Sequence, residues 1–121
     1  AARTHRERVL FDNGVLYQFL YRALQKDIRI PVTAGVMPVV RAGQIKRLTA
    51  QSGASLPPRF LAILDRFGAR PADMEKAGVA YATEQIIDLV ANGVNHIHLY
   101  TMNRPDVAAA IRRNLGGILQ P

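Results

Sequence analysis

Apolar residues recur with the period of an α-helix in several segments of the chain. The first segment follows the polar turn "DNG" at residues 12–14, whose side-chain oxygens suit a helix cap. Five apolar residues after this turn keep the i, i+3, i+4, i+7, i+8 spacing of one helix face: Leu16, Phe19, Leu20, Ala23 and Leu24. The pattern predicts a helix that ends near residues 25–27.

Further segments show the same helical period. The segment 59–67 places four apolar residues on one side: Phe60, Ile63, Leu64 and Phe67. The longest helix is expected over residues 72–91, with this stripe: Met74, Ala77, Tyr81, Ala82, Gln85, Ile86, Leu89 and Val90. A short helix is expected within 41–53, and a last helix begins at Pro105, since proline is tolerated in a first turn.

Three segments favour β-strands instead. They are "ERVLF" at 7–11, the β-branched stretch 28–40 that leads into a loop with Gly and Pro, and "VNHIHLYT" at 94–101. Alternation along the third strand puts His96, His98 and Tyr100 on one face and the apolar residues on the other. We expect the apolar face to meet helices and the polar face to line a barrel interior or a cleft.

The strands and helices alternate with connections long enough for each strand to return parallel, which predicts an α/β fold with a parallel sheet. A parallel sheet needs cover on both faces, and three strands do not provide it. The pattern therefore indicates part of a doubly wound sheet or of a (β/α)8 barrel.

The composition limits the expected cellular location of the protein and the class of its partners. The chain has the size of one domain, contains no Cys, and offers no apolar run long enough for a signal peptide or a membrane span. A reducing, cytoplasmic location without membrane contact is the simplest expectation. The net charge of +7 suits an anionic partner, but the cations are spread along the chain without a stacking platform, so nucleic acid is not expected.

Most catalytic motifs are absent from the sequence. There is no glycine-rich phosphate loop and no serine nucleophile motif, and His96 and His98 have metal-ligand spacing without further ligands to complete a site. We therefore expect no nucleotide-triphosphate site, no nucleophilic triad and no metal site in this chain. The carboxylates of the helices fall mostly away from the apolar stripes, where a solvated face is expected: Asp65, Asp73, Glu75, Glu84 and Asp88.

Two polar residues have a better position for binding a ligand. Gln44 follows the second strand and its loop, and Arg104 follows the third strand. Ligands of parallel α/β folds gather at the carboxyl ends of strands, so both side chains are expected at one rim. A capping role or exposure to solvent is the alternative for each residue.

Four blocks of sequence, in this order and spacing, resemble the C-terminal part of the methylenetetrahydrofolate reductase family: "IPVTAGVMPVVRAGQIKRL", "GASLPPRF", "GVAYATEQIIDLVANGV" and "IHLYTMNRP". The resemblance covers roughly residues 9–115. It implies that residues 1–121 are a single domain or domain fragment made of the last three strand–helix units of a (β/α)8 barrel. The sequence lacks an initiating Met, and residues 1–8 read as an altered start of that unit.

The family resemblance also implies an activity. It is the reduction of 5,10-methylenetetrahydrofolate to 5-methyltetrahydrofolate by NADH or NADPH through FAD, a step of one-carbon metabolism that serves methionine biosynthesis. The family's catalytic residues and most of its FAD contacts lie upstream of the matching part. This chain is accordingly expected to contribute folate binding, to be inactive alone, and to associate with the missing barrel part or with copies of itself.

In the family, residues that match Gln44 and Arg104 contact the folate, and Arg104 would face the tail carboxylates. Two positions depart from the family pattern: Arg8 stands where a pterin-binding glutamine is usual, and Leu48 where an aromatic residue stacks on the ligand. The alternative function is a noncatalytic α/β binding or assembly module derived from the family.

Overall fold

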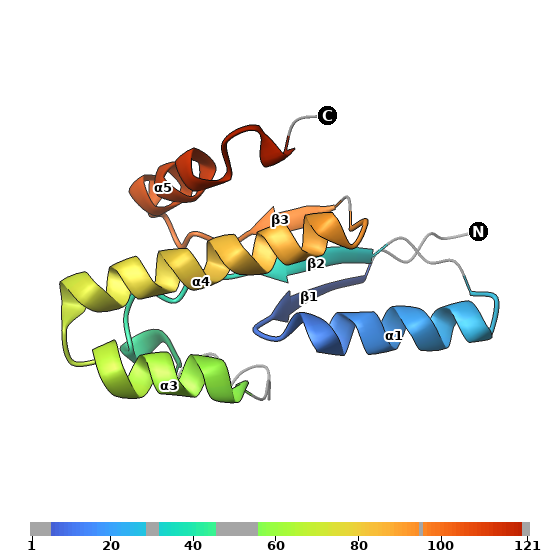
Figure 1. Cartoon of the computed structure of the whole chain (residues 1–121), viewed down its shortest axis with the longest axis horizontal. Helices are drawn as coiled ribbons and strands as arrows, with labels where there is room; N and C mark the ends of the chain where they lie inside the picture. The colour runs from blue at the N-terminus through green and yellow to red at the C-terminus, as the bar shows by residue number, and fades with distance from the viewer. Residues whose placement is uncertain (1–5, 29–31, 46–55, 95, 120–121) are drawn as a thin grey trace.

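A computed structural model describes residues 6–28, 32–45, 56–94 and 96–119 of the chain. Its elements, in chain order, are β1 (Arg6–Leu10), α1 (Asn13–Gln25), β2 (Val32–Val36), α3 (Pro58–Phe67), α4 (Pro71–Ala91), β3 (Ile97–Leu99), α5 (Pro105–Leu115) and the 3-10 helix η1 (Gly116–Leu119) (Figure 1). The predicted strand and helix order is confirmed. Of the short helix predicted within 41–53, residues 43–45 are helical and residues 46–53 lie outside the described residues.

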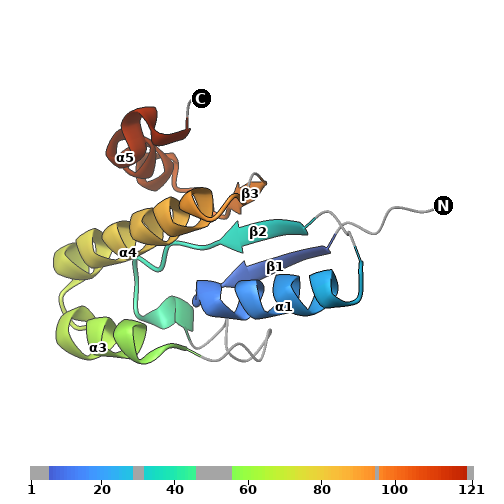
Figure 2. The same cartoon turned by 45° about the vertical axis from the view of Figure 1, so that its right-hand side comes forward.

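The three strands form one parallel sheet in the order β1-β2-β3, as the alternation of strands and helices predicted. In its register Gly35 stands opposite His98, and Val36 stands opposite Leu99. β3 spans three residues, fewer than the eight of the predicted segment 94–101. Because all strands point the same way, their carboxyl ends share one edge of the sheet (Figure 2).

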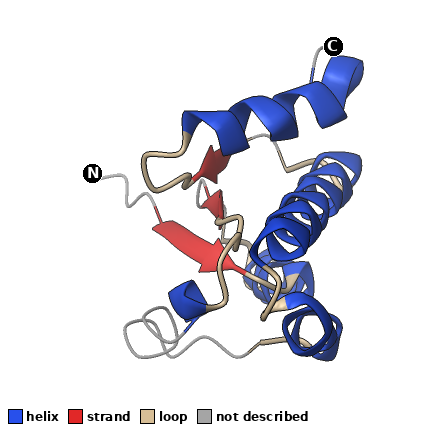
Figure 3. Ribbon diagram, turned by 90° about the vertical axis from the view of Figure 1, so that its left-hand side faces the viewer, coloured by secondary structure: helices blue, strands red, loops and turns tan. Residues whose placement is uncertain are grey.

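In Figure 3 most of the helices lie to the right of the strands, and one further helix lies above them. Ala34 and Val36 of β2 point toward the helices and are at most 1% exposed. They pack in a core cluster with Ile86 and Leu89 of α4 and with Ile111 of α5. Burial of these side chains holds the sheet against α4 and α5 through the hydrophobic effect.

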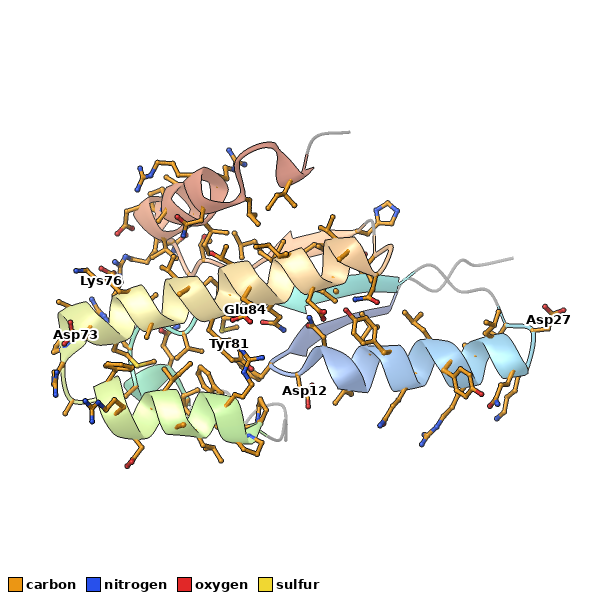
Figure 4. All side chains as sticks on the ribbon, viewed as in Figure 1. Asp12, Asp27, Asp73, Lys76, Tyr81 and Glu84 are labelled. Atoms are coloured by element: carbon orange, nitrogen blue, oxygen red, sulfur yellow. The ribbon has the colours of Figure 1, made fainter. Side chains whose placement is uncertain are left out.

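A second cluster joins α3 to the first residue after β1. Phe60 of α3 is 1% exposed, and its ring stacks on Phe11 with 5.8 Å between ring centroids. Tyr81 lies between α4 and α3 (Figure 4), with its ring centroid 5.1 Å from that of Phe60, and its hydroxyl donates to the carbonyl of Phe11 at 2.6 Å. These contacts hold α3 against α4.

The apolar stripe of α1 is only partly covered. Leu16 is 6% exposed, but Phe19 is 40% and Leu24 is 65% exposed. Among the described residues α4 is the helix that packs beside α1, so one flank of α1 lacks a neighbour. A helix with a neighbour on each flank buries a wider apolar stripe than a helix with one neighbour. Part of the α1 stripe therefore stays exposed beside α4 alone.

No helix in the described ranges is long and apolar enough to span a membrane.

At Gly78, α4 comes very close to the segment that follows β2. A β-carbon built on Gly78 would lie 1.8 Å from the carbonyl oxygen of Val39, which follows β2. A backbone carbonyl cannot swing aside like a flexible side chain, so only glycine fits at this contact. The apolar pattern did not single out this residue, because a glycine contributes no apolar side chain to a periodic stripe.

We predict that Gly78→Ala destabilises the fold. Alanine gains about 1 kcal/mol of helix propensity over glycine, but the clash with Val39 costs on the order of 3 kcal/mol, so a net loss of about 2 kcal/mol is expected. Urea unfolding followed by circular dichroism measures it. Gly43→Ala is the matched control, since nothing lies within 4 Å of a β-carbon there. Equal stability of the two variants would contradict the close approach.

Candidate functional site

A cavity of about 550 Å³ opens at the carboxyl ends of β2 and β3. Its wall consists of two segments, Met37 to Gln44 after β2 and Thr101 to Val107 at the junction of β3 and α5. The parallel sheet brings these segments together although about 60 residues separate them in sequence. Both predicted site residues, Gln44 and Arg104, line this one cavity.

The base of the cavity is apolar and well packed. Met37 and Val40 are 8% and 6% exposed, and Val107 is 3% exposed. Val40 and Val107 belong to the core cluster that joins the sheet to α4 and α5. The apolar wall is therefore rigid, because movement of either side chain would disturb that core.

Gln44 caps the turn that follows β2. Its side-chain oxygen Oε1 accepts hydrogen bonds from the backbone N–H groups of Val40 at 2.9 Å and Arg41 at 3.0 Å. A backbone N–H can only donate, so the carboxamide must present its oxygen to the turn and keep Nε2 for other partners. The capping alternative is thus observed, and it leaves Gln44 with donor capacity toward the cavity.

Arg104 is held by carboxylates from two helices. Its Nε donates to Asp106 Oδ1 at 3.0 Å, and its Nη2 donates to Asp106 Oδ2 at 2.9 Å and also to Glu75 Oε1. Glu75 lies on α4 and Asp106 in the first turn of α5, so the guanidinium ties the two helices together. The remaining nitrogen, Nη1, has no partner among the described residues.

This network perturbs the acid–base behaviour of both partners. The hydrogen bonds and charge of Arg104 lower the pKa of Asp106 to about 2. Hydrogen bonds to Asp106 and Glu75 raise the pKa of Arg104 above its usual value. The guanidinium therefore stays charged, and Asp106 stays ionised, across the physiological pH range.

The turn between β3 and α5 has an unusual backbone. Met102 and Asn103 have φ values of 52° and 62°, in the left-handed region that costs free energy for residues other than glycine. The turn is closed by a hydrogen bond from the Arg104 N–H to the Thr101 carbonyl at 3.0 Å. Backbone conformations of this kind concentrate at ligand-binding sites.

The polar face predicted for the third strand is confirmed in part. The rings of His98 and Tyr100 stack with 4.2 Å between centroids, so the two side chains share one face of the sheet. They are not in the wall of the cavity that contains Gln44 and Arg104. Within the described residues, no cluster of three or more His, Asp or Glu could bind a metal ion.

Sequence reasoning missed the carboxylate partners of Arg104. Glu75 was expected on a solvated face of its helix, but it pairs with a guanidinium 29 residues away. No spacing rule links the two positions. Asp106 had a usable signal, because an acidic residue in the first turn of a helix favours the dipole and lies within reach of the residue before the helix. Arg41, which lines the cavity, was not singled out either.

A second cavity of about 550 Å³ lies between α1, α3 and α4, and several of its polar groups bind one another, although the buried Asn13 Oδ1 has no hydrogen-bond partner among the described residues. Asp88 Oδ2 accepts from Asn13 Nδ2 at 2.8 Å and from the Tyr17 hydroxyl at 2.7 Å. These hydrogen bonds lower the pKa of Asp88, whereas burial and the bond to Asp88 raise the pKa of Tyr17 to about 12. The arrangement serves to fasten α1 to α4.

The fold and the first cavity together define an α/β protein with a parallel sheet and a candidate ligand site at the carboxyl ends of its strands. Comparison with known sequences gives the family. The family model described as methylenetetrahydrofolate reductase matches residues 4–116, nearly the whole chain. The chain belongs to the methylenetetrahydrofolate reductase family.

Individual relatives agree with this assignment. Methylenetetrahydrofolate reductase (NADH) 1 of Arabidopsis thaliana is 26% identical over 109 residues, which are 90% of this chain and 18% of the relative. The 5,10-methylenetetrahydrofolate reductase of Escherichia coli K12 is 24% identical over 106 residues, 88% of this chain and 36% of the relative. A probable methylenetetrahydrofolate reductase (NADPH) of Caenorhabditis elegans is 28% identical over 110 residues, 90% of this chain and 17% of the relative. The chain thus spans between about a sixth and about a third of the length of these relatives.

We predict that Arg104 sets the titration of Asp106. In the unchanged chain the Asp106 carboxyl should titrate with a pKa of about 2. In Arg104→Gln the pKa should rise toward the ordinary aspartate value of about 3.9, because the charged donor is lost. Carboxyl-carbon NMR during an acid titration measures both values. An Asp106 pKa that does not respond would exclude the ion pair.

Proposed function

We propose that this chain is the C-terminal, folate-binding part of a (β/α)8 barrel that reduces 5,10-methylenetetrahydrofolate to 5-methyltetrahydrofolate. The reductant is NADH or NADPH acting through FAD. The reaction is a step of the one-carbon metabolism that supplies methionine, and we place it in the cytoplasm. The observation that carries the proposal is the shared cavity: Gln44 and Arg104, which match the folate-contacting positions of the family, line it from two different loops.

The chemistry of the cavity suits the tail of a folate. The apolar side chains of Met37, Val40 and Val107 can pack against the aminobenzoyl ring. Nη1 of Arg104 and Nε2 of Gln44 are donors that retain capacity among the described residues, and a carboxylate or an amide carbonyl accepts from both. A cavity with an apolar base and hydrogen-bond donors at its rim matches a ligand that has an aromatic ring and an anionic end.

FAD would supply the hydride transfer when bound. The described wall of this cavity does not fit its pyrophosphate: the backbone N–H groups of Val40 and Arg41 already donate to Gln44, and Asp106 places a negative charge in the first turn of α5. We therefore assign no residue of this described cavity wall to FAD. The flavin contacts belong to other parts of the barrel in this proposal.

The exposed surfaces support a barrel that extends beyond this chain. α1 leaves Phe19 and Leu24 exposed, and the three-stranded sheet has strand edges that a closed barrel would pair. We infer that further strand–helix units, or a second copy of the chain, cover them. A noncatalytic α/β binding module is the competing function, and it shares the fold but requires no flavin chemistry.

We predict that the isolated chain is flavin-free and inactive, because this proposal places the flavin contacts and the catalytic residues in other parts of the barrel. The measurements are the absorbance spectrum of the purified chain and NADH-dependent reduction of menadione. A flavin band between about 350 and 500 nm, which the cofactor itself would produce, would contradict the assignment of its contacts elsewhere. So would a steady rate above background.

We predict that Arg104→Ala, in the complete reductase that contains this chain, weakens folate binding about ten- to a hundredfold. A hydrogen bond between a guanidinium and a carboxylate contributes about 1.5–3 kcal/mol, and each 1.4 kcal/mol is a factor of about ten. Reduction of the flavin by the pyridine nucleotide should change little, since that half-reaction involves no folate carboxylate. Stopped-flow measurement of the two half-reactions separates these effects.

The matched control for that experiment is Arg113→Ala, which removes an exposed guanidinium from the last turn of α5 outside the cavity. Equal losses in both half-reactions, or a lowered melting temperature with normal folate affinity, would show that Arg104 is purely structural.

A further inference from the structure

The second cavity, between α1, α3 and α4, contains a buried acceptor for which the described residues supply no donor. Asn13, the first residue of α1, is 9% exposed and lines the cavity. Its Nδ2 donates to the Gln85 carbonyl at 2.9 Å and to Asp88 Oδ2 at 2.8 Å, so these two bonds fix which end of the carboxamide is the donor. Its Oδ1 is buried and has no hydrogen-bond partner within the described ranges.

The unpartnered oxygen of Asn13 calls for a donor from outside the described wall. A buried acceptor without a donor destabilises a fold, and a bound molecule relieves that cost. The oxygen lies beside a carboxylate, since Oδ1 and the Nδ2 that binds Asp88 share one carbon. One water occupies about 30 Å³, whereas the cavity has a volume of about 550 Å³. The cavity therefore has room for a ligand larger than water that brings a donor to this oxygen.

The rim of this cavity is acidic, although the chain as a whole carries a net charge of +7. Three carboxylates line it, those of Asp12, Glu84 and Asp88, together with the guanidinium of Arg59. Figure 4 shows Asp12 and Glu84 where the three helices come together. Arg59 pairs with Glu84 at 3.0 Å, while Asp12 and Asp88 have no ion-pair partner among the described residues. Three negative charges and one positive charge leave −2, which favours a cationic ligand.

The two carboxylates without a cation keep capacity to accept hydrogen bonds. Asp12 Oδ1 accepts from the Gly14 N–H at 2.9 Å, and its Oδ2 has no partner in the part of the chain that the structure describes. Asp88 Oδ1 accepts only a long bond of 3.3 Å, from Asn92 Nδ2. Within the described residues these side chains form no metal-binding group. An ammonium group, which has three donors and no acceptor, suits such a wall.

Aromatic rings form the apolar part of the wall. Phe11 is 4% exposed, and Tyr17 and Tyr81 are half-buried. The guanidinium of Arg59 already lies 5.8 Å from the centre of the Tyr81 ring, so one cation is accommodated against this wall. Aromatic faces attract organic cations and also pack against their apolar chains. The wall thus fits a ligand that carries an ammonium group on a short hydrocarbon chain.

We propose that this cavity binds the protonated primary amino group of a small organic amine. The ammonium donates to Asn13 Oδ1 and to the Asp88 carboxylate beside it, while Asp12 adds negative charge at the rim. The hydrocarbon chain of the amine packs on the aromatic wall. The inference is independent of the proposed folate site, because the two cavities share no lining residue.

The test is a titration by saturation-transfer NMR, which observes the ligand, on the complete reductase that contains this chain. The probe is butylammonium, which is protonated at pH 7 because the pKa of an alkylamine is close to that of lysine, about 10.4. 1-Butanol has the same chain without the charge and is the matched ligand. We expect saturable binding of butylammonium with a Kd on the order of 1 mM, and binding of 1-butanol at least about tenfold weaker.

Two variants test where the amine binds. Asp12→Asn keeps a residue that caps helices well, and Asp88→Asn keeps a side-chain oxygen for Asn13 and Tyr17, so each removes a charge at little cost to the fold. Each variant should weaken butylammonium binding about three- to tenfold and leave 1-butanol unaffected. Asp65→Asn is the matched control, because it removes an exposed carboxylate of α3 outside the cavity.

Three results would overturn the inference, and the first and third need no variant. If butylammonium and 1-butanol bind equally, the cavity is only an apolar pocket. If both variants bind the amine as tightly as the unchanged protein, the amine binds elsewhere. If no saturable binding occurs, a water molecule alone completes Asn13 Oδ1.

A second probe, acetyllysine methylamide with a free side-chain amine, separates the sources of the ammonium group. Binding of both probes means that the cavity also accepts a lysine side chain of another protein. Binding of butylammonium alone restricts the cavity to free amines. Either result, combined with weakening in Asp12→Asn and Asp88→Asn, supports the site.

Discussion

The packing of α4 against β2 and the loop that follows it determines most of this structure. At Gly78 the helix comes so close to the carbonyl of Val39 that no side chain fits between them. This approach lets Ile86 and Leu89 cover the sheet from the same helix. It also places Met74, near the start of α4, in the second apolar cluster with Phe60. One helix thereby fixes the positions of the sheet, of α3 and of the candidate site.

The position of α4 determines which charges surround the candidate site. Because α4 lies beside the start of α5, Glu75 reaches Arg104, and Asp106 adds a second carboxylate from α5 itself. The guanidinium is thus oriented and permanently charged, but its charge is more than neutralised nearby.

Gln44 shows how one side chain can serve both the fold and a ligand. Its carbonyl oxygen is used by two backbone N–H groups, which fixes the turn after β2. The same bonds dictate which end of the carboxamide remains available. Structural capping and ligand contact, which the sequence presented as alternatives for Gln44, are compatible because a carboxamide has a donor end and an acceptor end.

The sequence by itself determined the order of strands and helices, the parallel sheet and the carboxyl-end location of Gln44 and Arg104, because these follow from apolar periodicity and from the direction of parallel strands. It did not determine how much of the α1 stripe is buried, since exposure of Phe19 and Leu24 depends on which neighbours are present. Only the tertiary structure paired Glu75 with Arg104, while Arg41 in the same cavity has no ion-pair partner among the described residues. Contacts between residues distant in sequence depend on how helices dock, and no local spacing encodes that.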